Sequence, residues 1–564
     1  MKKTRSASLV AIGLAALAAF AVRAASLDTQ SLWRDEVDAL RFATVRWADL
    51  LASFTRPGWN GPLYYVFLRG WVALTGTSEY ALRFFSLAFG VLCVPLAYAL
   101  GCRLFDRRTG LLAAVLIATS PYLAWYGQEV KMYTLLTALA LTAIYGLRRA
   151  VEGAGWRWWA VPVVATSLAF YSHILAALLI PVQVLLYLAW WPQARRQWRG
   201  ALVSLACLTL PYLPLVLWQA PLVLQSRETG FYAYTLGEMV RILLNGWSAG
   251  MHGWGWPWSA VLMGGLAAWG LVCPTGGTLV KVRQPVSSQE AHALATVSPA
   301  PVKWVTFVRV GDGGKGRGAG RLALVGWLAT PLLLVWLISL RQPLFTDRYL
   351  IWAAPAFYLL VALGLARVGR LGDRASRRGL GQTLARAAVV LLTGVILISD
   401  GVNLWRQATI PIKSDFRAAA AHVAHYREPD GPVAHQVNGA GEGAFKSYLP
   451  IVARGGFDDM IIFQIPYGRY TFDYYFPVEG YPSAEGLYTN HRTPDGAYLI
   501  GEQDVARRMQ EITAGYDAVW LVVTEMEMWD QRGLVRGWLE ANARRVDEAH
   551  FTRVDVYRYV MRDA

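Results

Sequence analysis

Eleven apolar runs, each long enough to cross a bilayer, constrain this chain more than any other feature of its sequence. A helix needs about 20 predominantly apolar residues to span the hydrocarbon core. The runs cover residues 8–27, 82–102, 110–126, 131–149, 158–173, 174–191, 201–220, 257–273, 321–340, 349–366 and 385–404. With 55% hydrophobic and only 16% charged residues, the chain is not an ordinary soluble protein. It is predicted to be an α-helical polytopic membrane protein with about 11 transmembrane helices.

The basic residues between these runs indicate how the chain is oriented. If the short apolar segment 62–76 lies in the membrane interface and does not cross, every basic loop falls on one side. Cytoplasmic loops are enriched in Lys and Arg, so this side is expected to be the cytoplasm. The N-terminus is then cytoplasmic and the C-terminal region extracytoplasmic. The protein is expected in the plasma membrane of the cell. The net charge of +16 thus reflects topology and does not require a nucleic-acid partner.

The same pattern divides the chain into two domains. Residues 1–404 are expected to form the transmembrane domain, with a first extracytoplasmic loop at 28–81 and a Gly-, Pro- and Ser-rich cytoplasmic insertion at 274–320. The first 26 residues also fit a secretory signal, although we expect them to remain as the first span. Residues 405–564 read as a small extracytoplasmic α/β domain, with a helix at 413–426 and strands at 431–437, 517–523 and 553–560. A further strand-like stretch, 303–310, lies in the insertion.

Two adjacent acids, Asp35 and Glu36, follow the first span in the sequence SLWRDEVDAL. One interpretation is structural, because carboxylates are favoured in the first turn of a helix. The other is functional: a carboxylate held against the outer leaflet can act as a general base. The sequence by itself leaves both open.

A second polar group lies in the loop before the run at 131–149, in the sequence PYLAWYGQEVKMY. It places Tyr126, Gln128, Glu129 and Lys131 at the outer surface of the membrane. The run that follows is predicted to point inward, so Lys131 stands near the positive end of its helix dipole. A cation is disfavoured there unless an anion is also present.

Arg348 repeats this arrangement at the outer start of the run at 349–366. Two cations at positive helix ends on one face of the membrane predict an anion site, and phosphate is the expected anion. His173 lies at the same depth between two runs, where it either contacts substrate or is bonded within the protein. The sequence has no metal-type cluster of Cys and His, so we expect no metal site of that kind.

Several segments together resemble the multi-pass GT-C glycosyltransferases related to protein O-mannosyltransferases and aminoarabinose transferases (family 39). The resemblance covers residues 1 to about 425, apart from the insertion. It is carried by RDE (34–36), the stretch PLYYVFLRG to RRTGLLAA (62–114), SPYLAWYGQEVKMY (120–133), YSH (171–173), DRYL (347–350) and KSDFRAAAA (413–421).

This resemblance implies a glycosyltransferase that moves a sugar from a polyprenyl phosphate to an extracytoplasmic lipid, glycan or protein acceptor, with inversion. It implies that Asp35 is the catalytic acidic residue, acting as general base, with Glu36 beside it, and that Gln128, Glu129 and Lys131 contact the substrate. No cofactor is required, although the carboxylates would also suit a divalent cation. The alternative is a polytopic transporter or lipid-linked sugar flippase, in which charged residues are expected near the membrane midplane.

Overall fold

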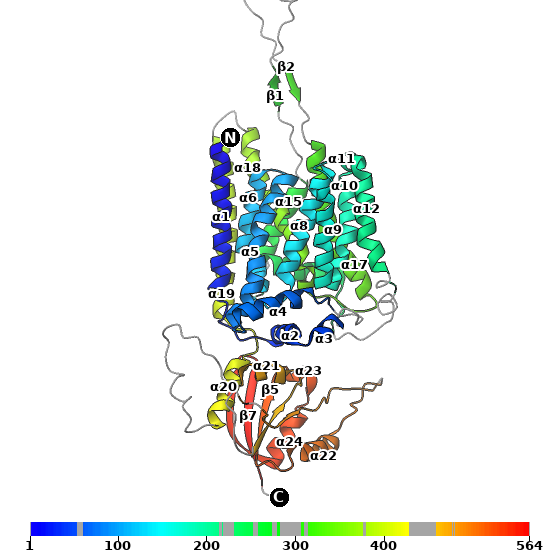
Figure 1. Cartoon of the computed structure of the whole chain (residues 1–564). Coiled ribbons are helices and arrows are strands. Elements are labelled where there is room, and N and C mark those ends of the chain that lie inside the picture. The colour runs from blue at the N-terminus through cyan, green and yellow to red at the C-terminus, as the bar shows by residue number, and fades with distance from the viewer. Residues whose placement is uncertain are drawn as a thin grey trace, which may run out of the picture.

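The computed structural model describes residues 2–52, 60–213, 217, 231–251, 258–272, 279–282, 306–309, 314–375, 380–427 and 458–562, apart from 477, 479 and 494. A helical bundle forms the larger part, and a smaller α/β domain lies at one end of it (Figure 1). The N-terminus lies at the end of the bundle away from the α/β domain. The predicted strand at 431–437 falls outside the described residues.

The bundle is built from long helices and several shorter ones. Its elements are α1 (Lys2–Ala24), α5 (Glu79–Leu104), α6 (Arg107–Thr119), α7 (Pro121–Gly127), α8 (Tyr133–Val151), α9 (Arg157–Ser172), η2 (Ile174–Leu178), α10 (Leu179–Ala189), α11 (Trp191–Ala194), η3 (Arg195–Gln197), α12 (Trp198–Thr209), η4 (Leu210–Tyr212), α14 (Leu236–Ala249), α15 (Trp258–Val272), α17 (Gly314–Ser339), η5 (Asp347–Ala353), α18 (Ala354–Ala375) and α19 (Leu380–Thr409).

Among the described residues, six helices are long and apolar enough to cross a membrane, or up to eight if each of two bent pairs counts as one span. The bends are 56° between α6 and α7 and 84° between α10 and the helices after it. Two other predicted runs form helices of only 16 and 15 residues, α9 and α15. The chain is thus a multi-pass membrane protein, but the expected number of eleven spans is not confirmed.

The first loop after α1 does not extend away from the bundle. Its helices α2 (Arg34–Thr44), α3 (Trp47–Ala52) and α4 (Leu63–Thr75) lie across the end of the bundle that faces the α/β domain (Figure 1). Gly76, with φ of 79°, ends α4 in a conformation that disfavours any other residue. Ser78 then caps α5 by accepting a hydrogen bond from the N–H of Ala81. This placement is compatible with an interfacial helix at 62–76, and its position relative to the membrane stays a prediction.

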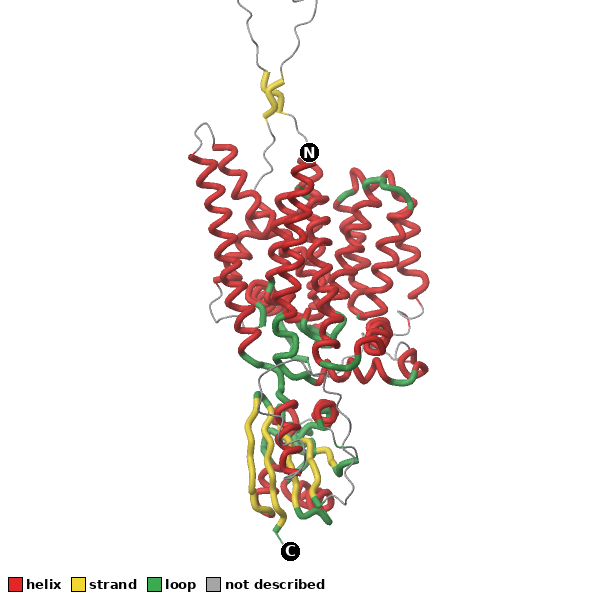
Figure 2. The backbone as a smooth tube through the Cα atoms, turned by 60° about the vertical axis from the view of Figure 1, so that its left-hand side comes forward, coloured by secondary structure: helices red, strands yellow, loops and turns green. Residues whose placement is uncertain are grey.

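Strands β1 (Leu279–Val282) and β2 (Thr306–Arg309) form an antiparallel hairpin within the 274–320 insertion. The second strand confirms the predicted strand-like stretch. Both views place this hairpin beyond the end of the bundle that is opposite the α/β domain (Figures 1 and 2). The hairpin and the α/β domain therefore lie at opposite ends of the bundle. That these two ends face opposite sides of the membrane stays a prediction.

The α/β domain is a mixed five-stranded sheet in the order β4-β3-β5-β7-β6. Its strands are β3 (Asp459–Phe463), β4 (Ser483–Glu485), β5 (Ala518–Val523), β6 (Ala543–Phe551) and β7 (Val554–Met561), and its helices are α20 (Phe416–Arg427), α21 (Gly468–Tyr475), α22 (Glu502–Thr513), α23 (Met526–Trp529) and α24 (Leu534–Asn542). The first three strands are parallel, and β7 pairs antiparallel with β5 and β6. The predicted helix at 413–426 and the strands at 517–523 and 553–560 are confirmed.

Alternation along the strands supplies a core on each face of this sheet. In β3, Ile461 packs with α20 and α21, whereas Ile462 packs with α22 and α24. The sheet is therefore a middle layer between two layers of helices. The face that carries α20 and α21 is the one that reaches the membrane domain, because α21 packs against α2.

Candidate active site between the bundle and the α/β domain

Asp35 lies in the first turn of α2 and faces a cation from a distant part of the chain. Its Oδ2 accepts a hydrogen bond from Arg348 Nη1 at 2.9 Å. The side chain of Asp35 is 28% exposed and that of Arg348 is 23% exposed. Asp35 is thus paired but still reachable from solvent, as a residue that removes a proton from a substrate must be. The structure brings together the predicted base and one of the two predicted phosphate ligands.

Glu36 is completely buried, and both of its carboxylate oxygens have cationic partners. Arg83 donates to Oε1 and Oε2 at 2.8 Å each, and Lys413 Nζ lies 2.9 Å from Oε2. Burial raises the pKa of Glu36, but Arg83 and Lys413 outweigh burial and lower it from 4.5 to about 2. The N–H of Val130 also donates to Oε1, at 3.1 Å. Glu36 therefore joins four segments of the chain and has no oxygen open to solvent.

Arg83 is the most completely bonded residue of this network. Its five N–H groups donate to the two oxygens of Glu36 and to the carbonyl oxygens of Leu27, Gln30 and Ser31. The guanidinium group thus fixes the path of the backbone from the end of α1 to the start of α2. We did not predict a role for Arg83 from the sequence, although a charged residue at the start of an apolar run was the available signal.

The other predicted substrate contacts are bonded within the protein. Gln128 Nε2 donates to Arg23 O and Ser26 Oγ, both at 2.8 Å, which ties the loop before α8 to the end of α1. The hydroxyl of Tyr126 donates to Asp347 at 3.0 Å. His173 Nδ1 accepts from the N–H of Leu175, and its ring lies 5.0 Å from that of Tyr349. The predicted contact of these residues with substrate stays a prediction.

Glu129 is buried and incompletely bonded. Within the described residues, its Oε2 has no hydrogen-bond partner. Burial raises the pKa of Glu129 from 4.5 to about 7, and the nearby carboxylates of Glu36 and Asp35 add to this, against the opposing charges of Lys413 and Arg348. Glu129 is therefore a buried acid that can change its protonation state near neutral pH.

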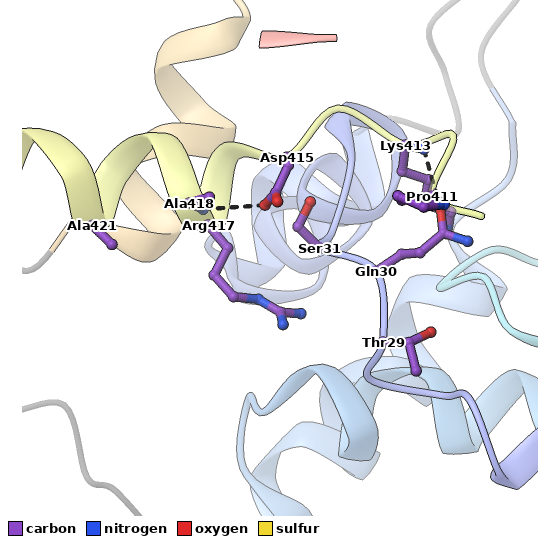
Figure 3. Close-up of a pocket in the computed structure, with 9 residues that line it drawn as sticks. All are labelled: Thr29, Gln30, Ser31, Pro411, Lys413, Asp415, Arg417, Ala418 and Ala421. Carbon is purple, nitrogen blue, oxygen red and sulfur yellow. Dashed lines mark hydrogen bonds between the residues drawn. The ribbon is translucent and has the colours of Figure 1, made fainter. Parts of the chain in front are cut away.

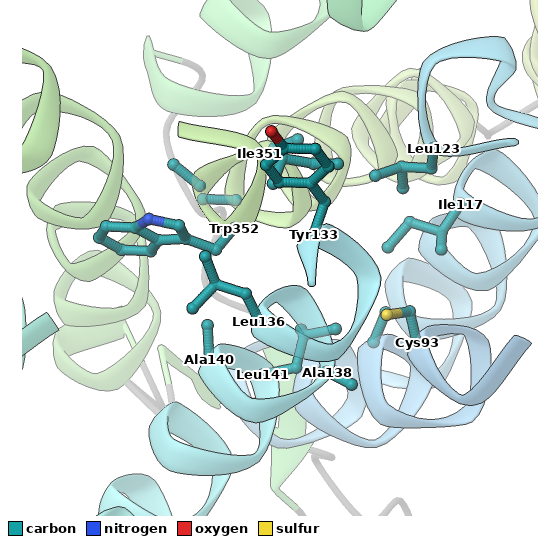
Figure 4. Close-up of a cluster of buried hydrophobic side chains, with 14 of the residues drawn as sticks. Cys93, Ile117, Leu123, Tyr133, Leu136, Ala138, Ala140, Leu141, Ile351 and Trp352 are labelled. Atoms are coloured by element: carbon teal, nitrogen blue, oxygen red, sulfur yellow. The ribbon is translucent and has the colours of Figure 1, made fainter. Parts of the chain in front are cut away.

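Lys131 and Arg348 lie where the sequence predicted them, beside the starts of two helices of the bundle. Lys131 comes two residues before α8, and Arg348 is the second residue of η5, which continues into α18. Tyr133 and Leu136 of α8 lie beside Ile351 and Trp352 of η5 in the buried cluster, so the two helix starts are held together (Figure 4).

Several polar atoms around Arg348 lack a partner among the described residues. They are Arg348 Nε, Trp33 Nε1 and Glu129 Oε2, all buried, and the ammonium group of Lys131, which has neither a hydrogen bond nor an ion pair in the described ranges. Arg348 lies 5.7 Å from the centre of the Trp33 ring. Buried polar groups are usually paired, so this set of three donors and one acceptor is suited to a polar, anionic ligand.

A pocket of about 210 Å³ opens beside this site, between the first loop and the segment that follows α19 (Figure 3). It is lined by Thr29, Gln30, Ser31, Pro411, Lys413, Asp415, Arg417, Ala418 and Ala421. Lys413 is the one lining residue that also contacts Glu36. Among the described residues, no group of three or more His, Cys, Asp and Glu side chains could hold a metal ion.

Comparisons with known proteins agree with this architecture. Residues 57–218 match the family model described as dolichyl-phosphate-mannose-protein mannosyltransferase. The apo structure of ArnT from Cupriavidus metallidurans superposes with a TM-score of 0.55 at 13% identity, over 99% of this chain and 98% of that one. The chain has a GT-C fold. The resemblance indicated by the sequence motifs is thereby confirmed.

Two other GT-C structures extend the comparison. ArnT bound to undecaprenyl phosphate gives a TM-score of 0.53 at 13% identity, over 98% of each chain. The oligosaccharyltransferase AglB from Archaeoglobus fulgidus, in complex with an inhibitory peptide and a dolichol-phosphate, gives 0.50 at 13% identity, over 97% of this chain and 74% of AglB. No curated protein sequence matches the chain. This GT-C chain thus shares a whole-chain architecture with ArnT that includes the α/β domain.

Proposed function

We propose that this GT-C protein is a membrane glycosyltransferase that transfers a sugar from a polyprenyl phosphate to an acceptor on the side of the α/β domain. The observation that carries the proposal is Lys131, which has no partner in the described ranges, beside the Asp35–Arg348 pair. A partly exposed carboxylate, two cations and unpaired donors gather at one end of an apolar bundle. This suits a donor whose lipid tail lies in the membrane and whose phosphate lies at its surface.

In the proposed reaction, Asp35 accepts the proton of an acceptor hydroxyl or amine as general base. The acceptor oxygen or nitrogen forms a bond to the anomeric carbon of the sugar as the bond from that carbon to the phosphate oxygen breaks. The phosphate leaves with the electron pair, on the face opposite the attack, so the configuration is inverted. Lys131 and Arg348 stabilise the charge that develops on the phosphate, because their cations are in place before the reaction begins.

The Asp35–Arg348 hydrogen bond gives this mechanism an order. Before the donor binds, Arg348 is occupied by Asp35 at 2.9 Å. A donor phosphate competes for the same guanidinium group, and the carboxylate of Asp35 is then free to take the acceptor proton. Binding of the donor therefore activates the base.

Transfer by an Asp35→Asn variant tests this proposal. Asparagine keeps the shape of the side chain but cannot accept the proton, so turnover should fall by at least about 10²-fold. Purified enzyme would be incubated with a panel of labelled polyprenyl-phosphate sugars and acceptor-containing membrane extract, and the labelled product would be measured. Near-wild-type turnover by the variant would refute the assignment of Asp35. Movement of the labelled lipid across the bilayer without a new product would instead support a flippase.

A further inference from the structure

The segment that joins α19 to the α/β domain is attached to the first loop along its length. Gln30 Oε1 accepts hydrogen bonds from the N–H groups of Ile412 and Lys413, at 3.1 and 3.2 Å. Ser31 Oγ donates to Ser414 O at 2.7 Å. Gln30, Ser31 and Lys413 are seen together at the wall of the pocket (Figure 3). Residues 412–414 and residues 30–31 therefore have a fixed relative position.

From this segment, the side chain of Lys413 reaches the first turn of α2. Its ammonium group lies 2.9 Å from Glu36 Oε2, and the lysine is only 7% exposed. Glu36 also accepts from the N–H of Trp33, the residue that precedes α2. Because Asp35 and Glu36 are consecutive residues of one helical turn, a displacement of Glu36 moves Asp35 with it.

We propose that Lys413 is a positioning residue of the active site: through its ion pair with Glu36 it holds the turn of α2 that presents Asp35 to the acceptor. The site is then complete only when the segment leading into the α/β domain is docked. This inference rests on the proposed function, since it assigns to Asp35 a position that matters for chemistry.

Two cations share Glu36, and their geometry gives them different tasks. Arg83 holds the first loop itself, since three of its five N–H groups donate to carbonyl oxygens of residues 27–31. Lys413 is, among the described residues, the one cation that brings a bond to Glu36 from beyond α19. Loss of Lys413 leaves Arg83 as the one cationic partner of Glu36 among the described residues, and α2 can then tilt about that contact.

A second ion pair provides a matched control. Arg417, on α20, pairs with Glu79 at the start of α5, with side chains 43% and 13% exposed. It too joins the α/β domain to the bundle, but its other hydrogen bond is to the carbonyl oxygen of Asp28, before α2 begins. An Arg417→Met variant therefore weakens the attachment of the α/β domain without removing a contact to Glu36.

The experiment compares full-length Lys413→Met, Lys413→Arg and Arg417→Met proteins with the wild type in lipid nanodiscs. We measure the donor KM and kcat, and kcat is corrected for the fraction of folded protein, which the thermal unfolding signal gives. We also measure hydrogen–deuterium exchange of residues 33–44. Lys413→Met should lower kcat by about 10²-fold, the loss expected when a reacting group is displaced by about 1 Å, with the donor KM little changed. Arginine also pairs with a carboxylate, so Lys413→Arg should recover most of kcat. Exchange in residues 33–44 should be faster in Lys413→Met alone.

Other results would overturn the proposal. A wild-type kcat in Lys413→Met, or an equal loss of kcat in Arg417→Met, would reduce Lys413 to a tether between domains. If Lys413→Met does not yield folded protein, Lys413→Gln takes its place, because glutamine also removes the charge that pairs with Glu36. A wild-type kcat in Lys413→Gln, or an equal loss of kcat in Arg417→Met, then contradicts positioning by Lys413. Wild-type protein that transfers no sugar from any donor in the panel would refute the proposed function. In that case, hydrogen–deuterium exchange still tests whether Lys413 holds α2. Unchanged exchange of residues 33–44 in Lys413→Met would contradict that role.

Discussion

Replacing Glu129 with glutamine should remove a pH dependence from the stability of the unliganded protein. The pKa of Glu129 is raised from 4.5 to about 7, with burial as the largest cause. A carboxyl whose pKa is higher in the folded state favours folding while it is protonated, so this contribution is fully present below pH 4.5 and is lost as the pH rises through 7. At about 1.4 kcal/mol for each pKa unit, the loss across this window is about 3 kcal/mol.

Glu36 acts in a separate pH window with the opposite sign. Its pKa is lowered to about 2, so its contribution is present above pH 4.5 and is lost as the pH falls toward 2. Above pH 4.5 the change due to Glu129 is therefore not cancelled by Glu36. The glutamine of the Glu129→Gln variant resembles the protonated acid, which is why the variant should match the wild type near pH 4.5 and exceed its stability by about 3 kcal/mol at pH 8.

The assay is reversible unfolding of the purified proteins in mixed micelles, titrated with denaturing detergent at several values from pH 4.5 to 8. The control is Glu152→Gln, an acid-to-amide change in the turn between α8 and α9, where the carboxylate pairs with Arg103 and Arg148. The difference between Glu129→Gln and wild type should grow with pH, and Glu152→Gln should not show this growth. If the stability of wild type and Glu129→Gln changes with pH in parallel, ionisation of Glu129 does not destabilise the folded protein and the reasoning is refuted.

The cations and the predicted topology can be tested in the same way. Lys131→Ala should weaken binding of polyprenyl phosphate, measured by the ligand-induced rise in unfolding temperature, while the stability of the unliganded protein stays unchanged. Arg348→Ala should weaken binding too and also lower that stability by about 1 kcal/mol, since it breaks a partly exposed ion pair. A Lys131→Ala protein that is markedly destabilised but binds normally would contradict a phosphate site. Arg83→Lys keeps the charge but supplies three donors in place of five, so at least two acceptors lose a partner at about 1–3 kcal/mol each; detergent unfolding measures this, and a wild-type midpoint would contradict it. A cysteine at Arg507 in a cysteine-free background should react with an impermeant maleimide from outside the cell, whereas one at Trp156 should not, and the reverse labelling would contradict the predicted topology.

The sequence predicted most elements whose signal is local. The helix α20 and the strands β5 and β7 follow from periodicity over a few residues, and Lys131 and Arg348 lie beside helix starts because apolar runs mark where spans begin. The bend between α6 and α7 also had a local signal that the hydropathy concealed: Ser120 caps α7 and Pro121 occupies its first position. Two short helices therefore stand where one apolar run was counted as one span.

The contacts of the site could not be predicted in the same way. Asp35 and Arg348 were predicted on the same side of the membrane, but their hydrogen bond joins residues 313 apart in the sequence and depends on how η5 packs against α8. Lys413 had been noted only as part of a motif, and its partner is equally remote. No local pattern in a single sequence specifies which of several cations pairs with which buried acid, since that depends on helix packing.

The bond between Glu36 and Lys413 also sets the moment at which the site can form during synthesis. The two residues are separated by 377 positions, which a ribosome working at about 5–20 residues per second covers in roughly 20 to 75 s. Throughout that interval α1 and the first loop have already been made, while the second counter-charge of Glu36 does not yet exist. A chain that is still being inserted therefore carries Lys131 before it carries a firmly held Asp35, and the site is completed late, when the segment after α19 has been delivered to the side of the α/β domain.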